Sequence, residues 1–213
     1  MGGVIRFPTE RRADLPTPGR PEGRSAAEAA PAPAPLADGE SFAFLSAEIR
    51  RIPRTDSRID GDIAGRILSR CVLSSLEILA KERVPVDLAG TVLRPVVEAR
   101  FPGPDGPTRA AQAGLAIRHA VTGVQREAEH EFFVFGAIAA GSMSRSDGGV
   151  TLTAGAPEQV AARLREHAAP GEFLMSEDAW QTCADSVRVA GTPIEVTMPG
   201  AEPVAAYPLT DPA

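Results

Sequence analysis

Apolar runs of two different periods alternate along this chain, and their order is the feature that most constrains its fold. Phe42–Ile49 is largely apolar, as in a buried strand, and apolar residues then recur at helical spacing up to about Arg83. Two strand-like runs follow, Val84–Leu93 and Val96–Phe101, and a tight turn is predicted between them at Arg94–Pro95. The first half of the chain is therefore expected to form a strand, a long helix and a hairpin.

A second helix and a second hairpin are expected next. The helix includes Ala110–Val121, and the apolar strand Phe132–Met143 follows it. The turn residues Ser144–Gly149 then fold the chain back into Val150–Thr153. Pro157 favours the first turn of a third helix, because proline is tolerated at that position. The strands expected beyond this helix are Glu172–Ser176, Val187–Ala190, Ile194–Met198 and Val204–Leu209.

This order of elements predicts an α+β domain over residues 39–213. Hairpins separate consecutive helices, which favours a mainly antiparallel sheet with helices on one face. The first six elements form a ferredoxin-like β-α-β-β-α-β core, and the later strands and helices extend it. Residues 1–38 are rich in proline, alanine and charge, so we predict a disordered tail there. A docking peptide around Pro31–Pro35 is the alternative interpretation of that tail.

Composition narrows the classes of partner and compartment. The formal net charge of −6 argues against a nucleic-acid partner, because phosphate-binding surfaces normally carry a basic bias. No run approaches the roughly 18 apolar residues of a membrane span, and the first residues lack the apolar core of a secretion signal. Cys71 and Cys183 have no metal-ligand spacing and are expected to be reduced core residues. We expect a cytoplasmic protein, and the heavy preference for arginine over lysine is typical of a GC-rich bacterial genome.

The segment from Gly155 to Ser176, GAPEQVAARLREHAAPGEFLMS, carries a specific resemblance. It resembles the class III nucleotidyl cyclase domain of adenylyl and guanylyl cyclases, whose pattern is close to G-x-x-V-N-x-A-A-R-L followed by A-x-P-G-E-I-L-V-S. Ile138–Gly141 is similar to the family's G-I-H-T-G strand, and Glu202–Tyr207 is similar to its closing E-P-V-x-V-Y. The resemblance extends over nearly all of residues 40–210.

The resemblance implies a particular chemistry. In the family, two metal ions held by two aspartates activate a 3′-hydroxyl for attack on the α-phosphate, and they neutralise charge on the phosphates. An asparagine and an arginine four residues apart on one helix face orient the ribose and stabilise the transition state. The site forms between two protomers, so the resemblance also implies a homodimer or a heterodimer with another cyclase-like domain, and a nucleotide as the possible ligand.

Some residues at the family's metal-binding and transition-state positions could still serve those roles, and others could not. The first aspartate falls on Glu48, whose extra methylene moves the carboxylate, and Mg²⁺ demands tight geometry. The second falls on Pro95, which has no ligand atom, and the neighbouring Arg94 would repel a metal. The asparagine falls on Gln159, and the arginine is retained as Arg163.

The positions that bind the nucleotide are also substituted. The base-reading lysine falls on Thr91, the other base-reading position falls near Leu152, and the phosphate-holding lysine falls near Met198. The nearest carboxylates to the predicted turn are Asp87 and Glu98, and neither lies inside it. We therefore expect no cofactor in a homodimer and little cyclase activity, with Mg or Mn bound only if a composite site forms with a partner.

Three functions follow from this combination. The first is a catalytically degenerate cyclase-like domain that acts as a regulatory or interaction module in signalling. The second is a half-site donor, which supplies Gln159 and Arg163 to a heterodimeric cyclase that converts ATP or GTP to a cyclic nucleotide. The third is a nucleotide-binding sensor without turnover. Arg163 has a structural alternative in each case, as a residue at a helix end or a dimer seam.

Overall fold

The computed structural model describes residues 41–127, 131–146, 149–152, 156–200 and 202–211. The tail predicted over residues 1–38 lies outside these ranges, and so does its alternative role in docking. No helix within the described ranges is both long enough and apolar enough to cross a membrane.

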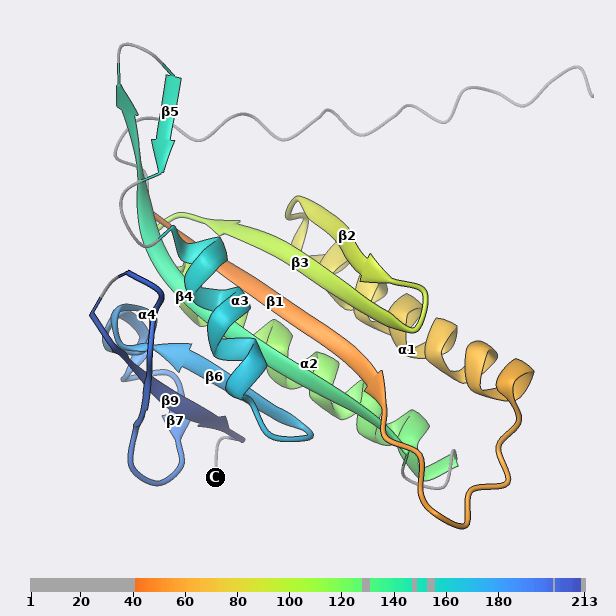
Figure 1. Ribbon diagram of the computed structural model, residues 1–213. Coiled ribbons are helices and arrows are strands. Elements are labelled where there is room, and N and C mark those ends of the chain that lie inside the picture. Colours follow the sequence, from red (N-terminus) through yellow and green to blue (C-terminus); the bar gives the residue numbers. More distant parts are fainter. Residues whose placement is uncertain (1–40, 128–130, 147–148, 153–155, 201, 212–213) are drawn as a thin grey trace, which may run out of the picture. The chain divides into compact units, whose positions relative to one another are not determined.

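A mostly antiparallel sheet forms the centre of the domain (Figure 1). Strand β1 (Ser41–Arg51) lies between β3 (Arg94–Pro102) and β4 (Phe132–Ser146), and it is antiparallel to both. The strand order is β2-β3-β1-β4-β6-β9-β7, with β5 beside β4 and β8 beside β9. Among the strands that the structure describes, only the pairing of β4 with β6 is parallel. The other strands are β2 (Val86–Thr91), β5 (Gly149–Leu152), β6 (Glu172–Ser176), β7 (Arg188–Val189), β8 (Ile194–Val196) and β9 (Val204–Thr210). This arrangement confirms the predicted α+β class.

Within the described residues four helices cover the sheet, and local signals set their ends. They are α1 (Gly61–Glu82), α2 (Gly106–Glu127), α3 (Pro157–His167) and α4 (Glu177–Cys183). Helix α1 begins where the Asp60 side chain accepts a hydrogen bond from the Ile63 amide, and it ends at Arg83, which has a left-handed φ of 54°. Helix α4 begins in the same way, because Ser176 accepts from the amide of Ala179.

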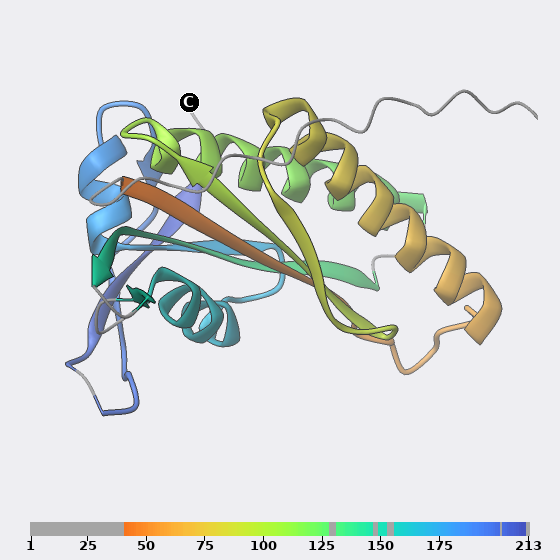
Figure 2. The ribbon, with the colours of Figure 1, turned by 90° about the horizontal axis from the view of Figure 1, so that it is seen from above.

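The helices occupy both faces of the sheet, which corrects one part of the expected arrangement. Helices α1, α2 and α4 pack against one face, as predicted, whereas α3 packs against the other (Figure 2). The parallel pairing of β4 with β6 explains this difference. A parallel pair requires a crossover connection, and the face opposite α1 and α2 is the one left free for it.

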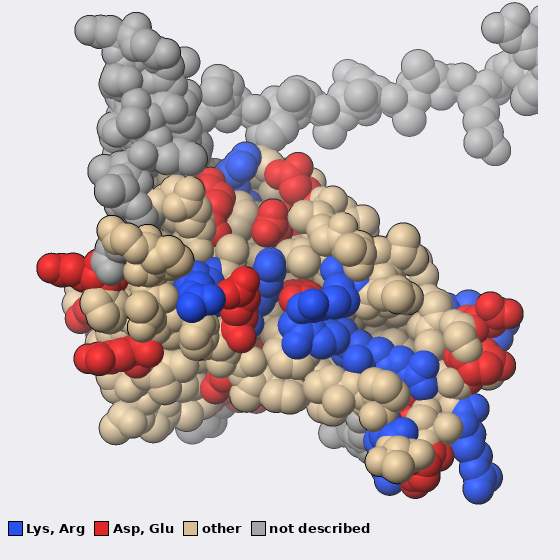
Figure 3. Space-filling model, in the orientation of Figure 1, with Lys and Arg blue, Asp and Glu red and all other residues tan. Residues whose placement is uncertain are grey.

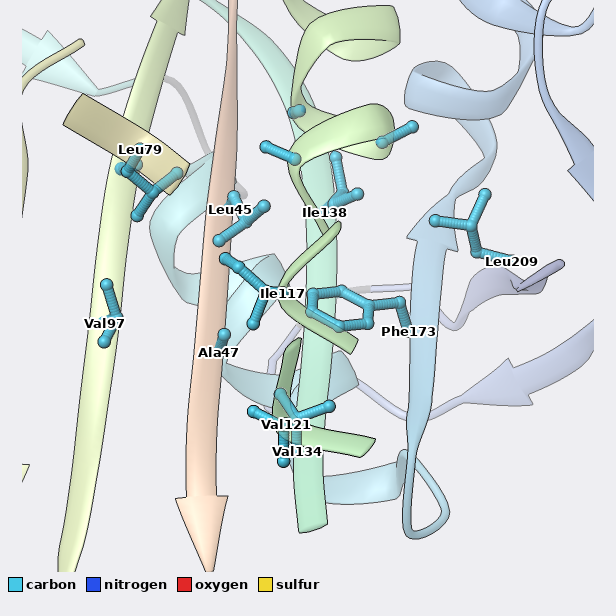
Figure 4. Packing of buried hydrophobic residues seen from close by; sticks show 14 of the residues in the cluster. Leu45, Ala47, Leu79, Val97, Ile117, Val121, Val134, Ile138, Phe173 and Leu209 are labelled. Carbon is cyan, nitrogen blue, oxygen red and sulfur yellow. The ribbon is translucent and has the colours of Figure 1, made fainter. Parts of the chain in front are cut away.

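The alternation of side chains along β1 separates two hydrophobic cores. Leu45 and Ala47 point towards α1 and α2, whereas Phe42 and Phe44 point towards α3. Figure 4 shows the larger core, in which residues from β1, α2 and β4 surround the ring of Phe173. The same alternation places Ser46 and Glu48 on the α3 face, and the candidate site is built there.

The hairpin turn between β2 and β3 lies two residues before its predicted position. Thr91 pairs with Arg94, so the turn consists of Val92 and Leu93, and the prediction of a turn at Arg94–Pro95 is wrong. Gly90 is the reason, because its φ of 81° lets the chain bend early, where a side chain would collide with the backbone of the returning strand. Pro95 lies just beyond the last residue pair between β1 and β3, where a missing N–H removes no bond from that ladder.

Candidate functional site

Glu48 is a buried carboxylate on the α3 face of the central strand. Its side chain is only 7 % exposed, although it lies near the end of β1, where water is close. In the sheet it is flanked by Val96 of β3 and Phe135 of β4, both of which are buried. A carboxylate in such surroundings needs charged or hydrogen-bonding partners, because burial of an unpaired charge is unfavourable.

Arginines supply those partners from three elements. The Nε of Arg94, on β3, donates to Oε1 of Glu48 at 2.6 Å, and the Nε of Arg50, on β1, donates to the same oxygen at 3.0 Å. The Nε of Arg165, on α3, lies 3.9 Å from Oε2. The guanidinium of Arg50 also lies 4.3 Å from the centre of the Phe135 ring, which holds it against the sheet. Glu48 is therefore enclosed by guanidinium groups.

This enclosure keeps Glu48 ionised. Burial raises the pKa of Glu48, but the hydrogen bonds and charges of Arg50 and Arg94 outweigh burial, so the pKa is lowered from its ordinary value. The same contact raises the pKa of Arg94. The carboxylate is thus a permanent anion at neutral pH, and its charge is already compensated within the chain.

A second polar cluster connects α3 to the sheet beside Glu48. The Ser46 hydroxyl donates to Oε1 of Glu98 at 3.1 Å, and Nη1 of Arg165 donates to the Ser46 hydroxyl and lies 3.6 Å from Glu98. Further along β3, Arg100 lies 3.5 Å from Glu158 at the start of α3. The side chain of Arg165 is only 14 % exposed, so these contacts hold α3 over the strand that carries Glu48.

The residues at the family's two aspartate positions do not fit the pair of metal ions that the family binds there. Mg²⁺ requires near-octahedral oxygen ligands, but Oε1 of Glu48 already accepts from two guanidinium groups. Pro95 offers no ligand atom, and Val92 and Leu93 place only apolar side chains at the turn. Across the described part of the chain, no three histidine, cysteine, aspartate or glutamate side chains are grouped as a metal site would require.

Arg163 and Gln159 lie on the outer surface of α3, away from Glu48. Nη1 of Arg163 donates to Glu166 at 2.6 Å, and its Nε donates to the carbonyl of Thr197 at 3.2 Å. The side chain of Arg163 is 36 % exposed, and Gln159, one turn earlier, is exposed. Within one chain, the retained arginine therefore joins α3 to the segment after β8, and it does not share a site with Glu48.

The three nucleotide-binding positions inferred from the sequence lie in three different environments. Thr91 is exposed at the end of β2, and its hydroxyl accepts from the amide of Arg94 at 3.2 Å. Met198 is buried in the core beneath α3, only 8 % exposed, where it offers phosphate no donor. Leu152 pairs with Met143 at the end of the β4–β5 hairpin, and its side chain is outside the described residues. Only Thr91 is connected to Glu48, through Arg94.

Sequence reasoning missed Arg165. It directly follows the Ala-Ala-Arg-Leu motif, and attention to the motif favours Arg163 instead. The signal was present in the helical spacing, because Arg165 stands beside the buried Leu164 and four residues after the buried Ala161. That spacing turns Arg165 towards the sheet and Arg163 away from it.

Comparison with known proteins identifies the fold. The sequence matches no family model and no curated protein. The structure is similar to the adenylyl cyclase CyaB from P. aeruginosa, with a TM-score of 0.65 and 15% identity over 82% of this chain and 95% of that one. It is also similar to an adenylate/guanylate cyclase/hydrolase from Silicibacter pomeroyi, with a TM-score of 0.61 and 19% identity over 83% of this chain and all of that one.

A third similar structure is a non-canonical dimeric guanylyl cyclase domain of the RhoGC fusion protein from Blastocladiella emersonii. Its TM-score is 0.59 and its identity 15%, over 82% of this chain and 98% of that one. The described residues thus have the fold of adenylyl and guanylyl cyclase domains, and the resemblance drawn from the Gly155–Ser176 segment is confirmed at the level of the fold.

Proposed function

We propose that this chain is a cyclase-like domain that has exchanged its metal site for an arginine–glutamate pair, and that it acts as a regulatory or interaction module in signalling. The contact between Arg94 and Glu48 at 2.6 Å is the observation that carries the proposal. A guanidinium group fixed on a carboxylate supplies the positive charge that a metal ion would otherwise supply there. It cannot lower the pKa of a bound hydroxyl as a metal does.

The expected loss of cyclase rate is large, and this supports the proposal. Removal of a single transition-state hydrogen-bond donor lowers an enzyme's rate by roughly 10²–10³. In this chain both carboxylate positions are altered, and three guanidinium groups surround the carboxylate that remains. A metal ion entering this site would have to displace Arg94 and would meet Arg50 and Arg165 at close range. The loss should therefore exceed that of one donor, and autonomous cyclase activity should be negligible.

The proposed partner is a second cyclase-like domain, in a homodimer or a heterodimer, and the dimeric cyclase domain among the similar structures supports this choice. We also propose a cytoplasmic location. Cys71 and Cys183 are buried free thiols, as is usual for proteins of reducing compartments. Neither proposal depends on the chemistry of the site.

A cyclase assay on the full chain tests the proposed function. The purified protein is incubated with ATP or GTP and either Mg²⁺ or Mn²⁺, and cyclic nucleotide is measured beside an active cyclase as the positive control. Circular dichroism verifies that the sample is folded. We expect no product above the protein-free background. Product formation that disappears in an Arg163→Ala variant would overturn the proposal, because it would show a working site that uses the retained arginine.

A further inference from the structure

A groove opens beside the Arg94–Glu48 pair, between α1, the end of β1 and the β2–β3 turn. Its volume is about 1110 Å³. That volume exceeds the roughly 300–1,000 Å³ of most small-molecule sites, so the groove has room for a segment of a protein. Its lining includes the apolar residues Leu73, Val92 and Leu93 and the charged residues Arg66, Arg94 and Asp62.

The upper walls of the groove are apolar side chains that point into solvent. Val92 is 90% exposed and Leu93 is 77% exposed at the turn, and Leu73 of α1 is 59% exposed. Glycine, asparagine, aspartate and proline are the residues that turn geometry favours, so the turn itself does not account for valine and leucine. Neighbouring exposed apolar side chains around a concave surface are typical of interaction sites.

The charge around this apolar surface is strongly basic. Five arginines line the groove, whereas Asp62 is its only acidic lining residue. Two more carboxylates lie behind the lining: Glu48, bound by Arg94 and Arg50, and Glu131, which accepts from Arg51 at 2.7 Å. Arginines therefore outnumber the carboxylates among the described residues at and behind the groove lining, on a chain whose formal net charge is −6. Figure 3 shows basic side chains gathered over the end of β1 and the β2–β3 turn.

We propose that this groove docks an acidic amphipathic segment of a partner protein. The apolar side of such a segment would cover Leu73, Val92 and Leu93, and its carboxylates would face the arginines around them. The proposal rests on the proposed function, since it gives the interaction module a site for a further partner besides the second cyclase-like domain.

Two other occupants have to be compared with this one. A second copy would have to offer the groove an acidic and apolar part of its own surface, because a two-fold interface joins different residues of the two subunits. A nucleoside polyphosphate would satisfy the arginines, but it would leave Val92 and Leu93 exposed at the tip of the turn. An acidic amphipathic segment complements both the charge and the apolar surface.

Fluorescence anisotropy with two labelled peptides tests the proposal on the full chain. The first is a 16-residue helical peptide with leucines at helical spacing and glutamates on both sides of the apolar stripe. The second has lysine in place of every glutamate. We expect the acidic peptide to bind at least tenfold more tightly than the basic one, and its affinity to fall as salt is raised.

A matched pair of substitutions localises the binding. Leu73→Glu changes a groove residue that is 59% exposed, and Leu88→Glu makes the same change at a residue 61% exposed that does not line the groove. Both positions are on the surface, so both variants should fold, which a thermal melt verifies. We expect Leu73→Glu to weaken the acidic peptide at least tenfold and Leu88→Glu to change its affinity less than twofold. Arg66→Glu should also weaken it severalfold.

Equal binding of the two peptides, or equal affinities in Leu73→Glu and Leu88→Glu, would overturn the proposal. Sedimentation that shows a dimer dissociated by Leu73→Glu would overturn it in favour of a second copy. Binding of ATP without binding of the acidic peptide would overturn it in favour of a polyphosphate. The two proposals can fail separately. If the acidic peptide does not bind and the cyclase assay gives no product, only the docking site is contradicted. If the peptide binds and the cyclase assay gives product, only the proposed function is contradicted.

Discussion

Arg94 and Glu48 form an ion pair across the β1–β3 ladder, with Nε of the arginine 2.6 Å from Oε1 of the glutamate. The two residues are unequal in their surroundings: the side chain of Arg94 is 58% exposed, whereas that of Glu48 is 7% exposed. The exposed partner therefore neutralises a charge that the sheet has removed from water. The difference in exposure between the two side chains guides the predictions below on the free energy of unfolding.

Replacement of Arg94 by alanine should destabilise the domain moderately. Glu48 would lose its shortest charged hydrogen bond but keep Arg50, so we expect the free energy of unfolding to fall by clearly more than it does when an exposed ion pair is broken. Arg54→Ala is the control, because Arg54 pairs with Asp56 where both side chains are largely exposed. Its loss should stay below about 0.5 kcal/mol. Equal losses in urea unfolding would show that the Arg94 contact is an ordinary surface pair.

Stability should fall in acid partly through Glu48. Its pKa is lowered in the folded state, so the stabilisation it provides is fully present above the pKa of the unfolded chain. It is lost as the pH falls below about 4.3, the usual glutamate value, and through the lower folded value. The free energy of unfolding, measured at pH 7 and pH 3.5, should therefore drop less in Glu48→Gln than in the unchanged protein. An identical drop in both would mean that Glu48 titrates as an exposed carboxyl does.

The two arginines of α3 should differ sharply in their effect on stability. Arg165→Ala would remove the buried link to Ser46, Glu98 and Glu48, and we expect a loss of about 2–3 kcal/mol in the free energy of unfolding, as for hydrogen bonds to charged groups. Arg163→Ala breaks a contact on the helix surface and should change stability by less than about 1 kcal/mol. Thermal unfolding of the two variants measures the contrast. A larger loss for Arg163 would contradict the assignment of Arg165 as the residue that holds α3.

Gly136→Ala should be destabilising, because a Cβ at this position of β4 would collide with the buried ring of Phe173. The ring is packed in the larger core and has little room to move, so we expect a loss of about 1–3 kcal/mol. Gly123→Ala is the matched control, since nothing lies within 4 Å of a Cβ in that part of α2. It should stabilise the protein by about 0.5–1 kcal/mol, because glycine is unfavourable within a helix. Urea midpoints that move in the same direction for both variants would contradict this packing.

Much of the fold could be predicted from local pattern. The apolar alternation of β1, the caps of α1 at Asp60 and Arg83, and the two hairpins are each set by residues close in sequence. The placement of α3 could not be predicted in this way, because it depends on the pairing of β4 with β6, which are separated by the whole helix. The β2–β3 turn was misplaced because Pro95 is a stronger turn signal in sequence than Gly90.

The candidate site was predictable only in part. The sequence analysis placed Glu48 near the end of the first strand and Arg94 in the predicted hairpin turn. It suggested that Arg94 would repel a metal, but it did not indicate that the two side chains pair. The helical spacing could place Arg165 on the buried side of α3, but its partners Ser46, Glu98 and Glu48 depend on which face of the sheet α3 covers. Contacts between distant strands and helices define this site, and local patterns do not report them.

Manganese binding tests the central claim most directly. The full chain is titrated with Mn²⁺, and free ion is followed by electron paramagnetic resonance, with a Glu48→Gln variant measured in parallel. Because guanidinium groups already bind Glu48, we expect the two proteins to leave the same amount of free Mn²⁺ at every concentration. Binding of one Mn²⁺ per chain that is lost in Glu48→Gln would contradict the account, because Glu48 would then be a metal ligand.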